Sequence, residues 1–255
     1  MNTTLGLRAL RNEFAKMRHL RIGAVVALLL GGGAALTVAW AMGSGLPDHR
    51  LDADGYGWRL LMVSLHSSAM LVAPVLLAVA ASRQVEIEHS GGGWWASAAA
   101  GAAPGRLCRA KLLALGLLVT PVPAVWGAIV AALGTAIGIA APFPAARLVG
   151  LVVSLMVIDL AVLAVQLLAS ARADNQLGPL ALGIIGTLLG LFSQIMPAWV
   201  RCLSPWTAYG LVAPADFVGE DLVDLDAHPG LLAALAVAGT ALFLAVTAHL
   251  DRREV

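Results

Sequence analysis

The 255-residue chain is too apolar to be a soluble domain. Hydrophobic residues make up 60% of it and charged residues 12%, and its mean hydropathy is +0.86, whereas soluble domains carry about 25% charged residues. The formal net charge of +1 gives no basic excess, so we expect no nucleic-acid partner. Two cysteines, Cys108 and Cys202, are too few for a disulfide framework and are expected to be free.

Residues 1–21 predict an amphipathic helix at the cytoplasmic surface of a membrane. Four apolar side chains fall on one arc of about 80° when each residue turns the helix by 100°: Leu7, Leu10, Phe14 and Met17. Four cations lie elsewhere on the helix: Arg8, Arg11, Lys16 and Arg18. Such a helix lies in the interface, with its cations near anionic lipid headgroups. The alternative is a basic leader that only sets topology.

Six apolar stretches follow, and each supplies the roughly 20 residues that a helix needs to cross about 30 Å of hydrocarbon. They are Ile22 to Met42, Leu60 to Ala81, Leu112 to Ile139, Leu148 to Ala169, Pro179 to Val200 and Leu231 to Leu250. The first is longer than the 7–15-residue core of a signal peptide, so we expect it to be retained. The connections are too short for a second domain. We therefore predict an all-α fold in which residues 1–255 form one transmembrane domain with six spans.

The distribution of cations predicts the orientation. Twelve of the 16 Lys and Arg residues fall on the side that holds the two termini. The other side holds only four: Arg50, Arg59, Arg147 and Arg201. By the positive-inside rule, both termini are expected to be cytoplasmic.

The connection between the second and third spans, residues 82–111, is predicted to be a long cytoplasmic loop with a short helix. Gly91 to Gly93 break the preceding helix, and Trp94 and Trp95 open a new one that ends before Pro104. The two tryptophans have two interpretations. They anchor the loop in the membrane interface, or they offer an aromatic knob to a soluble partner.

Two carboxylates precede these glycines. Glu86 and Glu88 continue just past the second span, where carboxylates need contact with water or with a cation. We therefore expect both to lie at the membrane edge, on the same cytoplasmic loop as the tryptophans.

On the other side of the membrane, residues 201–230 are too many for a tight hairpin. Pro205, Trp206 and Tyr209 predict short helices that lie at, or dip into, the outer leaflet, where they would form an extracellular gate or lid. For residues 216–228, which are rich in acids, a disordered loop is the alternative.

One acid lies within a span. Asp159 is at the middle of the fourth span, where an ionised carboxylate costs about 3 kcal/mol, so it should face protein or water. It is a candidate for the transport pathway, with a structural helix contact as the alternative. Gln166, seven residues further on, and His66 on the second span are candidate partners. For His66 alone, a structural polar contact is the stronger interpretation.

Several catalytic motifs are absent from the sequence. A nucleotide-binding P-loop needs Gly-Lys-Ser/Thr, but the two lysines, Lys16 and Lys111, each follow an alanine. The GxSxG, HExxH and CxxC motifs are also missing. We therefore expect no catalytic residue, no metal site and no cofactor bound by this chain.

Taken together, these parts resemble the ABC transporter type 2 permeases, in particular the small lantibiotic-immunity and bacitracin-resistance permeases. That family's first cytoplasmic loop often presents an acid, glycines, an apolar short helix, then Pro, Arg and Lys. The matching residues appear in the same order here: Glu88, Gly91 to Gly93, Trp94, Trp95, Pro104, Arg106 and Lys111. The segment Ser204-Pro205-Trp206-Thr207 is similar to the family's sequence after the fifth span.

The resemblance implies a bacterial cytoplasmic-membrane subunit that works with a separate ABC ATPase dimer, which binds ATP and Mg. The residues that it assigns to ATPase coupling are Glu86, Glu88, Trp94, Trp95, Pro104 and Arg106. It also implies a second permease, identical or related, and export of an amphipathic cargo such as a peptide antibiotic. The alternatives are a secondary transporter or channel that works alone, and a membrane immunity protein that sequesters a partner without transport.

Overall fold

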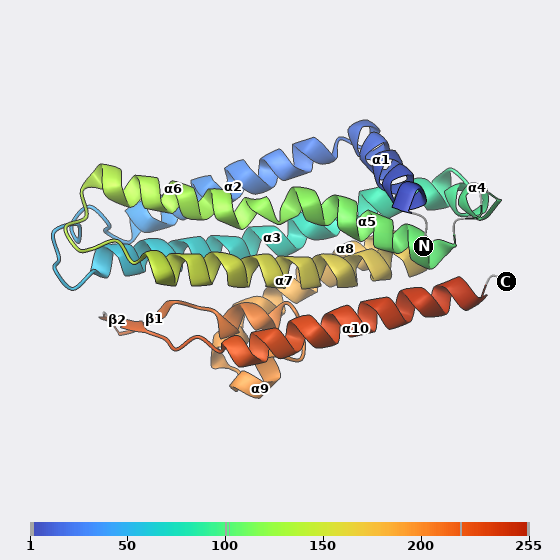
Figure 1. Ribbon diagram of the computed structural model, residues 1–255. Helices are drawn as coiled ribbons and strands as arrows, with labels where there is room; N and C mark the ends of the chain where they lie inside the picture. The colour runs from blue at the N-terminus through green and yellow to red at the C-terminus, as the bar shows by residue number, and fades with distance from the viewer. Residues whose placement is uncertain (1–2, 100, 102, 220, 254–255) are drawn as a thin grey trace.

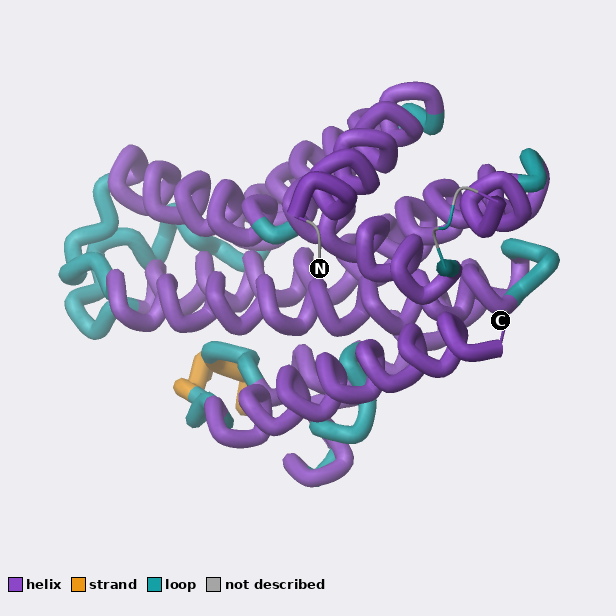
Figure 2. Tube along the Cα trace, turned by 45° about the vertical axis from the view of Figure 1, so that its right-hand side comes forward, coloured by secondary structure: helices purple, strands orange, loops and turns teal. Residues whose placement is uncertain are grey.

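Long apolar helices lie side by side along one direction, as the ribbon and tube views show (Figures 1 and 2). The computed structural model describes residues 3–99, 101, 103–219 and 221–253. The helices are α1 (Thr3–His19), α2 (Ile22–Gly43), α3 (Tyr56–Ser90), α4 (Gly93–Ala99), α5 (Pro104–Val119), α6 (Pro121–Ile137), α7 (Ala145–Arg172), α8 (Leu177–Leu191), α9 (Ala198–Arg201) and α10 (Pro229–Arg253). Two 3₁₀ turns, η1 (Ser193–Ile195) and η2 (Thr207–Leu211), and two strands, β1 (Ala215–Val218) and β2 (Asp221–Asp224), complete the described elements.

Within the described residues, five helical segments are long and apolar enough to cross a membrane: α2, α3, α5 together with α6, α7 and α10. They correspond to five of the six predicted spans. The third span bends between α5 and α6, where the Thr120 N–H still donates to the Gly116 carbonyl at 2.8 Å, but Pro121 and Pro123 have no N–H to continue the pattern.

The predicted boundary of the fifth span is wrong. Its helix, α8, ends at Leu191 rather than Val200 and has 15 residues, which is about 22 Å of helix and less than a full crossing. The chain then turns through η1 to Pro197. Met196 precedes this proline and has extended backbone (ψ 146°), as is usual for a residue before proline. The apolar run therefore continues past the point where the helix stops.

The chain is also not entirely α-helical. β1 and β2 form an antiparallel hairpin in which Ala215 pairs with Asp224 and Val218 with Asp221. Gly219, in the turn, has a φ of 68°, which glycine adopts without strain. The acid-rich segment, for which disorder was the alternative, therefore begins as an ordered hairpin.

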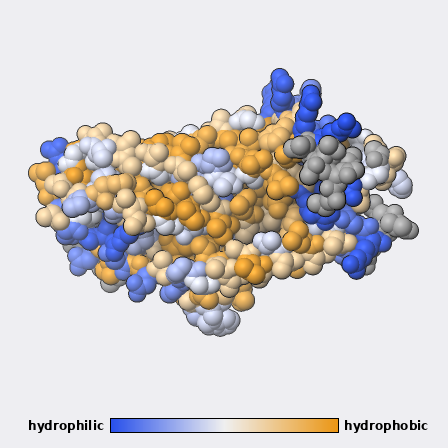
Figure 3. Space-filling view, in the orientation of Figure 1, coloured by the Kyte–Doolittle hydropathy of each residue, from blue (hydrophilic) through white to orange (hydrophobic). Residues whose placement is uncertain are grey.

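On the face seen in Figure 3, the surface has an apolar middle and two polar ends. Hydrophobic side chains cover the middle of the molecule in Figure 3, and hydrophilic ones gather at the two ends. One end carries the hairpin; the other, which we call the α4 end, carries α1, α4 and the last turns of α10 (Figure 1). This pattern is that of a membrane-embedded protein, because lipid solvates the apolar girdle.

Helix α3 is the most buried span, and α2, α6, α7 and α8 pack against it. At the α4 end, α1 packs Met17 into the core and Leu10 and Phe14 against it. Its cations Arg8 and Arg11 are exposed. The predicted apolar stripe therefore faces the bundle; Leu7 belongs to the part of α1 whose side chains are outside the description.

Tryptophan rings pack directly against glycines at two helix contacts. A Cβ atom on Gly33 would overlap the ring of Trp126, whose indole N–H donates to the Leu30 carbonyl at 3.0 Å. Gly134 receives Trp58 in the same way. Small residues let helices and large rings approach closely, so these glycines are required for space rather than for backbone freedom.

We predict that Gly33→Ala lowers the free energy of unfolding by about 1–3 kcal/mol relative to Gly32→Ala, because only the first substitution overpacks the core. Both positions are in α2, and a Cβ at Gly32 meets nothing within 4 Å. Thermal unfolding of the two variants in the same detergent measures the difference. Equal midpoints would show that the Trp126 contact is not rigid.

Candidate functional site

Five polar side chains meet inside the bundle at the α4 end. We call them the lysine cluster: Glu13 and Lys16 on α1, Gln84 and Glu88 on α3, and Lys111 on α5. The side chains of Lys111, Glu13 and Glu88 are 0%, 1% and 2% exposed. Charged side chains are almost never this buried unless they are paired.

Lys111 is at the centre of the cluster. Its Nζ donates to Glu13 Oε2 at 2.7 Å, to Glu88 Oε1 at 2.7 Å and to the Gln84 carbonyl at 2.9 Å. Three acceptors satisfy the three donors of an ammonium group. The Gln84 side chain joins the cluster through Glu13, because its Nε2 donates to Glu13 Oε2 at 2.8 Å. Gln84 and Glu88 are four residues apart and lie on the same face of α3.

Lys16 closes the cluster on its outer side. Its Nζ donates to Glu13 Oε1 at 2.9 Å and to Glu88 Oε1 at 2.6 Å. Partial burial works against the charge of Lys16, but the hydrogen bonds and charges of Glu88 and Glu13 outweigh burial, so the pKa of Lys16 is raised. Two ammonium groups thus neutralise two carboxylates, and three helices are joined by charge-assisted hydrogen bonds.

Helix α4 begins directly on this cluster. A Cβ atom on Gly93, the first residue of α4, would overlap the Glu88 carboxylate. Trp94 is half-buried, and its ring meets the ring of His89 edge-on at 5.7 Å between centroids. Trp95 is 84% exposed. The two adjacent tryptophans therefore differ: Trp94 packs the short helix onto α3, and Trp95 projects from it.

The structure separates the six residues predicted for ATPase coupling. Glu86, Trp95 and Arg106 are exposed, whereas Glu88 and Pro104 are buried, so neither of the latter is open to contact by a partner. The reason is that α3 continues to Ser90, which makes residues 82–90 helix rather than loop and turns Glu88 toward Lys111.

The start of α5 is also attached to α10. Arg109 Nη2 lies 2.7 Å from Asp251 Oδ2, and the Arg106 N–H donates to Asp251 Oδ1 at 3.1 Å. A Cβ atom on Gly105 would overlap the Thr247 carbonyl. A carboxylate at a helix N-terminus is favourable because it meets the positive end of the helix dipole. The segment that follows α4 is therefore fixed to the end of the chain.

A second polar group lies in the middle of the bundle. The Tyr209 hydroxyl donates to Asp159 Oδ1 at 2.6 Å, and His66 Nε2 lies 2.9 Å from the Tyr209 carbonyl. The carbonyl accepts, so Nε2 carries the proton in this contact. All three residues are at least 97% buried. Asp159 and His66, the candidates for the pathway, thus both contact Tyr209, a predicted gate residue in η2.

Gln166 does not take part in this group. Seven residues separate it from Asp159 on α7, about 10 Å along the helix. In the amide orientation that satisfies both of its polar atoms, Gln166 donates to the Pro179 carbonyl and accepts from the Gly183 N–H on α8, each at 3.0 Å. It therefore contacts the backbone of α8.

The predicted gate residues are buried against the bundle. Pro205, Trp206 and Tyr209 are all buried, and the Trp206 indole fills the space where a Cβ of Gly186 would lie. Arg201 holds this segment together, because its guanidinium donates to three carbonyls: those of Met196, Gln194 and Gly210, at 2.8, 2.6 and 2.7 Å. The segment after α8 thus folds back on α8 and α7.

Sequence reasoning missed Glu13, Gln84, and the ion pair of Arg109 with Asp251. Glu13 carries a usable signal, because at 100° per residue it falls about 40° from Met17, at the edge of the apolar arc of α1, where a carboxylate beside apolar side chains requires a partner. The sequence marks Lys111 only as the last residue of the loop pattern and as a lysine outside any P-loop, and neither indicates that it is buried. Among the described residues, no three His, Cys, Asp or Glu side chains are grouped as a metal site requires.

A family model described as "ABC-2 family transporter protein" matches residues 9–190, a range that contains the whole lysine cluster, α4 and Asp159. A search of curated proteins finds no match.

We predict that Lys111→Met lowers the free energy of unfolding by about 3–5 kcal/mol, because it leaves two buried carboxylates without their central cation. Lys16→Met is the matched control, because the Lys16 side chain is 29% exposed and its loss should cost less. Thermal unfolding in detergent measures both. A smaller effect at Lys111 than at Lys16 would contradict the central position of Lys111.

We predict that Tyr209→Phe destabilises the protein by about 1–3 kcal/mol, because Asp159 Oδ1 would lose its donor while buried. Asp159 Oδ2 already has no hydrogen-bond partner among the described residues. The control is Tyr56→Phe, at the other tyrosine of the chain. In a double-mutant cycle with Asp159→Asn, the two changes should be non-additive; strict additivity would show that the hydrogen bond contributes nothing.

Proposed function

This chain belongs to the ABC-2 transporter family, and from that membership we propose that it is the permease subunit of an ABC exporter whose ATPase is a separate chain. As a family member it is a membrane component of an ABC transporter, because the matching region covers residues 9–190 and its helices are apolar enough to span a membrane. The observation that carries the proposal is the seating of α4, with its projecting Trp95, on a buried charge cluster.

Helix α4 is the proposed docking point for the ATPase. Trp95, near the start of α4, and Arg106, near the start of α5, are both exposed. Exposed tryptophan and arginine side chains are favoured at interaction hot spots. Trp94, which is half-buried, and Glu88 and Pro104, which are buried, would hold this docking surface in place. Glu86 is exposed on α3, at the same end of the protein.

Displacement of α4 by the ATPase would act on the bundle through two sets of contacts. The Gly93 backbone lies against the Glu88 carboxylate, so displacement of α4 disturbs the lysine cluster and with it α1, α3 and α5. On the other side of the connection, Arg109 and Asp251 link α5 to α10. Close-packed contacts and ion pairs of this kind have discrete arrangements, so a ligand that favours one of them shifts the population of the whole bundle.

The ATPase partner would supply the nucleotide chemistry. We propose that ATP and Mg bind only there, since neither lysine of this chain is in a P-loop. A second permease, identical or related, would complete the pathway. The least covered spans are α2 and α10, which expose large apolar side chains such as Leu28, Val237 and Leu242 to lipid or to that second permease.

The cargo that we propose is amphipathic, including peptide antibiotics, as the resemblance to lantibiotic-immunity and bacitracin-resistance permeases implies. The apolar spans suit such a cargo better than a sugar or an ion. With both termini cytoplasmic, η2 and the hairpin would lie toward the exterior, and Asp159, His66 and Tyr209 would hold the re-entrant segment. Transport by the permease without any ATPase would instead support the alternative of a secondary transporter.

We predict that Trp95→Ala weakens binding of the ATPase subunit about tenfold or more, the loss expected at a hot spot. Trp199→Ala is the control, because Trp199 is 66% exposed on α9, away from α4 (Figure 1). Co-purification with the ATPase encoded beside this chain, and stimulation of its hydrolysis, give the readouts. Failure of the wild type to recover any ATPase would contradict the proposal; equal binding by the two variants would remove Trp95 from the docking surface.

A further inference from the structure

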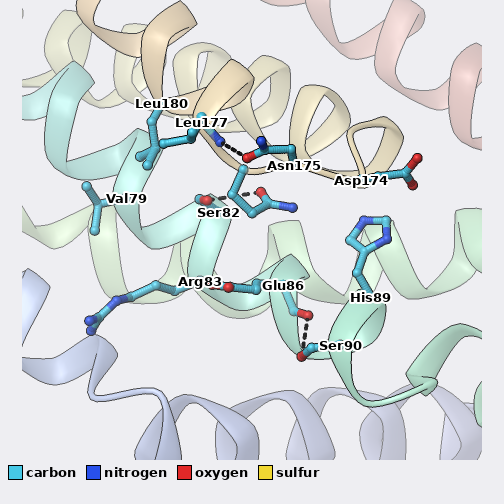
Figure 4. A pocket seen from close by; sticks show the side chains of 11 residues that line it. Val79, Ser82, Arg83, Glu86, His89, Ser90, Asp174, Asn175, Leu177 and Leu180 are labelled. Carbon is cyan, nitrogen blue, oxygen red and sulfur yellow. Dashed lines mark hydrogen bonds between the residues drawn. The ribbon is translucent and has the colours of Figure 1, made fainter.

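A cleft of about 700 Å³ opens at the α4 end between α3 and the turn that joins α7 to α8. Figure 4 shows its lining. The side chains divide by chemistry: Val79, Leu177 and Leu180 are apolar, and Arg83, Glu86 and Asp174 are charged. The volume is within the range of small-molecule sites. A hydrogen bond from Ser82 Oγ to Gln176 Oε1, at 3.0 Å, ties the two walls together.

The charged side chains that line this cleft make no ion pairs in the part of the chain that the structure describes. Among the described residues, neither Arg83, Glu86 nor Asp174 takes part in an ion pair. Arg83 makes one hydrogen bond, from Nη1 to the Leu20 carbonyl at 3.2 Å, which leaves its other donors available. The cleft thus offers one guanidinium and two carboxylates to a ligand.

The elements around the cleft indicate that it lies at a membrane surface. Leu20 is in the turn between α1 and α2, where the chain passes from the amphipathic helix into the first span, and Arg83 is bonded to it. Val79 is in the apolar part of α3, and Leu177 begins α8. In a membrane that covers the apolar spans, the apolar wall would lie on the membrane side of the cleft and the charged wall at the level of lipid headgroups.

We propose that this cleft binds a phospholipid whose headgroup carries both a phosphate and a primary ammonium, such as phosphatidylethanolamine, from the leaflet at the α4 end. The acyl chains would lie along Val79, Leu177 and Leu180. Arg83 would donate to the phosphate, since guanidinium matches phosphate geometry. Glu86 and Asp174 would accept from the ammonium, which has three N–H donors, whereas a choline headgroup has none.

Lipid retention by the purified permease, without any ATPase, tests this proposal. The protein is exchanged into detergent with equal amounts of phosphatidylethanolamine, phosphatidylcholine and phosphatidylglycerol of the same acyl chains, and bound lipid is counted by native mass spectrometry. The wild type should retain phosphatidylethanolamine about tenfold over the other two, the ratio expected for charge-assisted hydrogen bonds. The double variant Glu86→Gln/Asp174→Asn should lose this preference, and Arg83→Gln should lower retention of all three lipids.

The control variants are Asp48→Asn and Arg50→Gln, which change exposed charges in the loop after α2 and should leave retention unchanged. Equal retention of phosphatidylethanolamine and phosphatidylcholine by the wild type would overturn the proposal, as would a preference for phosphatidylglycerol, which indicates a site for anions only. Unchanged lipid retention together with lost ATPase binding in the cleft variants would assign the cleft to the ATPase. Because the lipid assay contains no ATPase, its failure is distinct from failure of the proposed function.

Discussion

The α4 end of the protein depends on the ion pairs and hydrogen bonds of the buried Lys111 ammonium. This ammonium is wholly buried, and its three donors meet acceptors from α1 and α3 at 2.7–2.9 Å. An ion taken out of water is tolerated only when its partners are close and complete. Three helices must therefore hold a common geometry for the charges of Glu13, Glu88 and Lys111 to remain balanced. The cluster specifies how α1, α3 and α5 meet more than it adds to net stability.

Helix α3 connects this end to the buried acid. Glu88 and His66 are 22 residues apart on the same helix, about 33 Å along it, with Pro74 between them. Glu88 belongs to the lysine cluster and lies against α4, while His66 bonds to the segment that Tyr209 ties to Asp159. A single helix therefore contacts both the proposed docking region and the segment that carries η2. In the proposed permease, movement of α3 would couple the two.

The sequence predicted the parts of this molecule better than their contacts. Apolar length located the spans, because backbone pairing inside lipid leaves few alternatives, and the glycines after Ser90 located α4. The predicted fifth span is too long because hydropathy does not register the turn at η1 (Ser193–Ile195), which lies within the apolar run. Asp159, at mid-span, is expected to face protein or water, with Gln166 and His66 as candidate partners, but the donor that it meets, Tyr209, lies 50 residues further along the chain and no local pattern pairs them. Glu88 is expected to meet water or a cation at the membrane edge, but its cation, Lys111, lies 23 residues further along the chain, so the pairing is a tertiary contact that no local pattern shows.

The distance between α4 and α1 tests whether the lysine cluster positions α4. Spin labels would be attached at Trp95→Cys and Arg18→Cys, both exposed, with Cys108 and Cys202 replaced by alanine. Pulsed electron paramagnetic resonance should give one narrow distance distribution when Lys111 is present and a broad one in Lys111→Met. Identical distributions in the two proteins would contradict the account, because α4 would then keep its place without the buried charges.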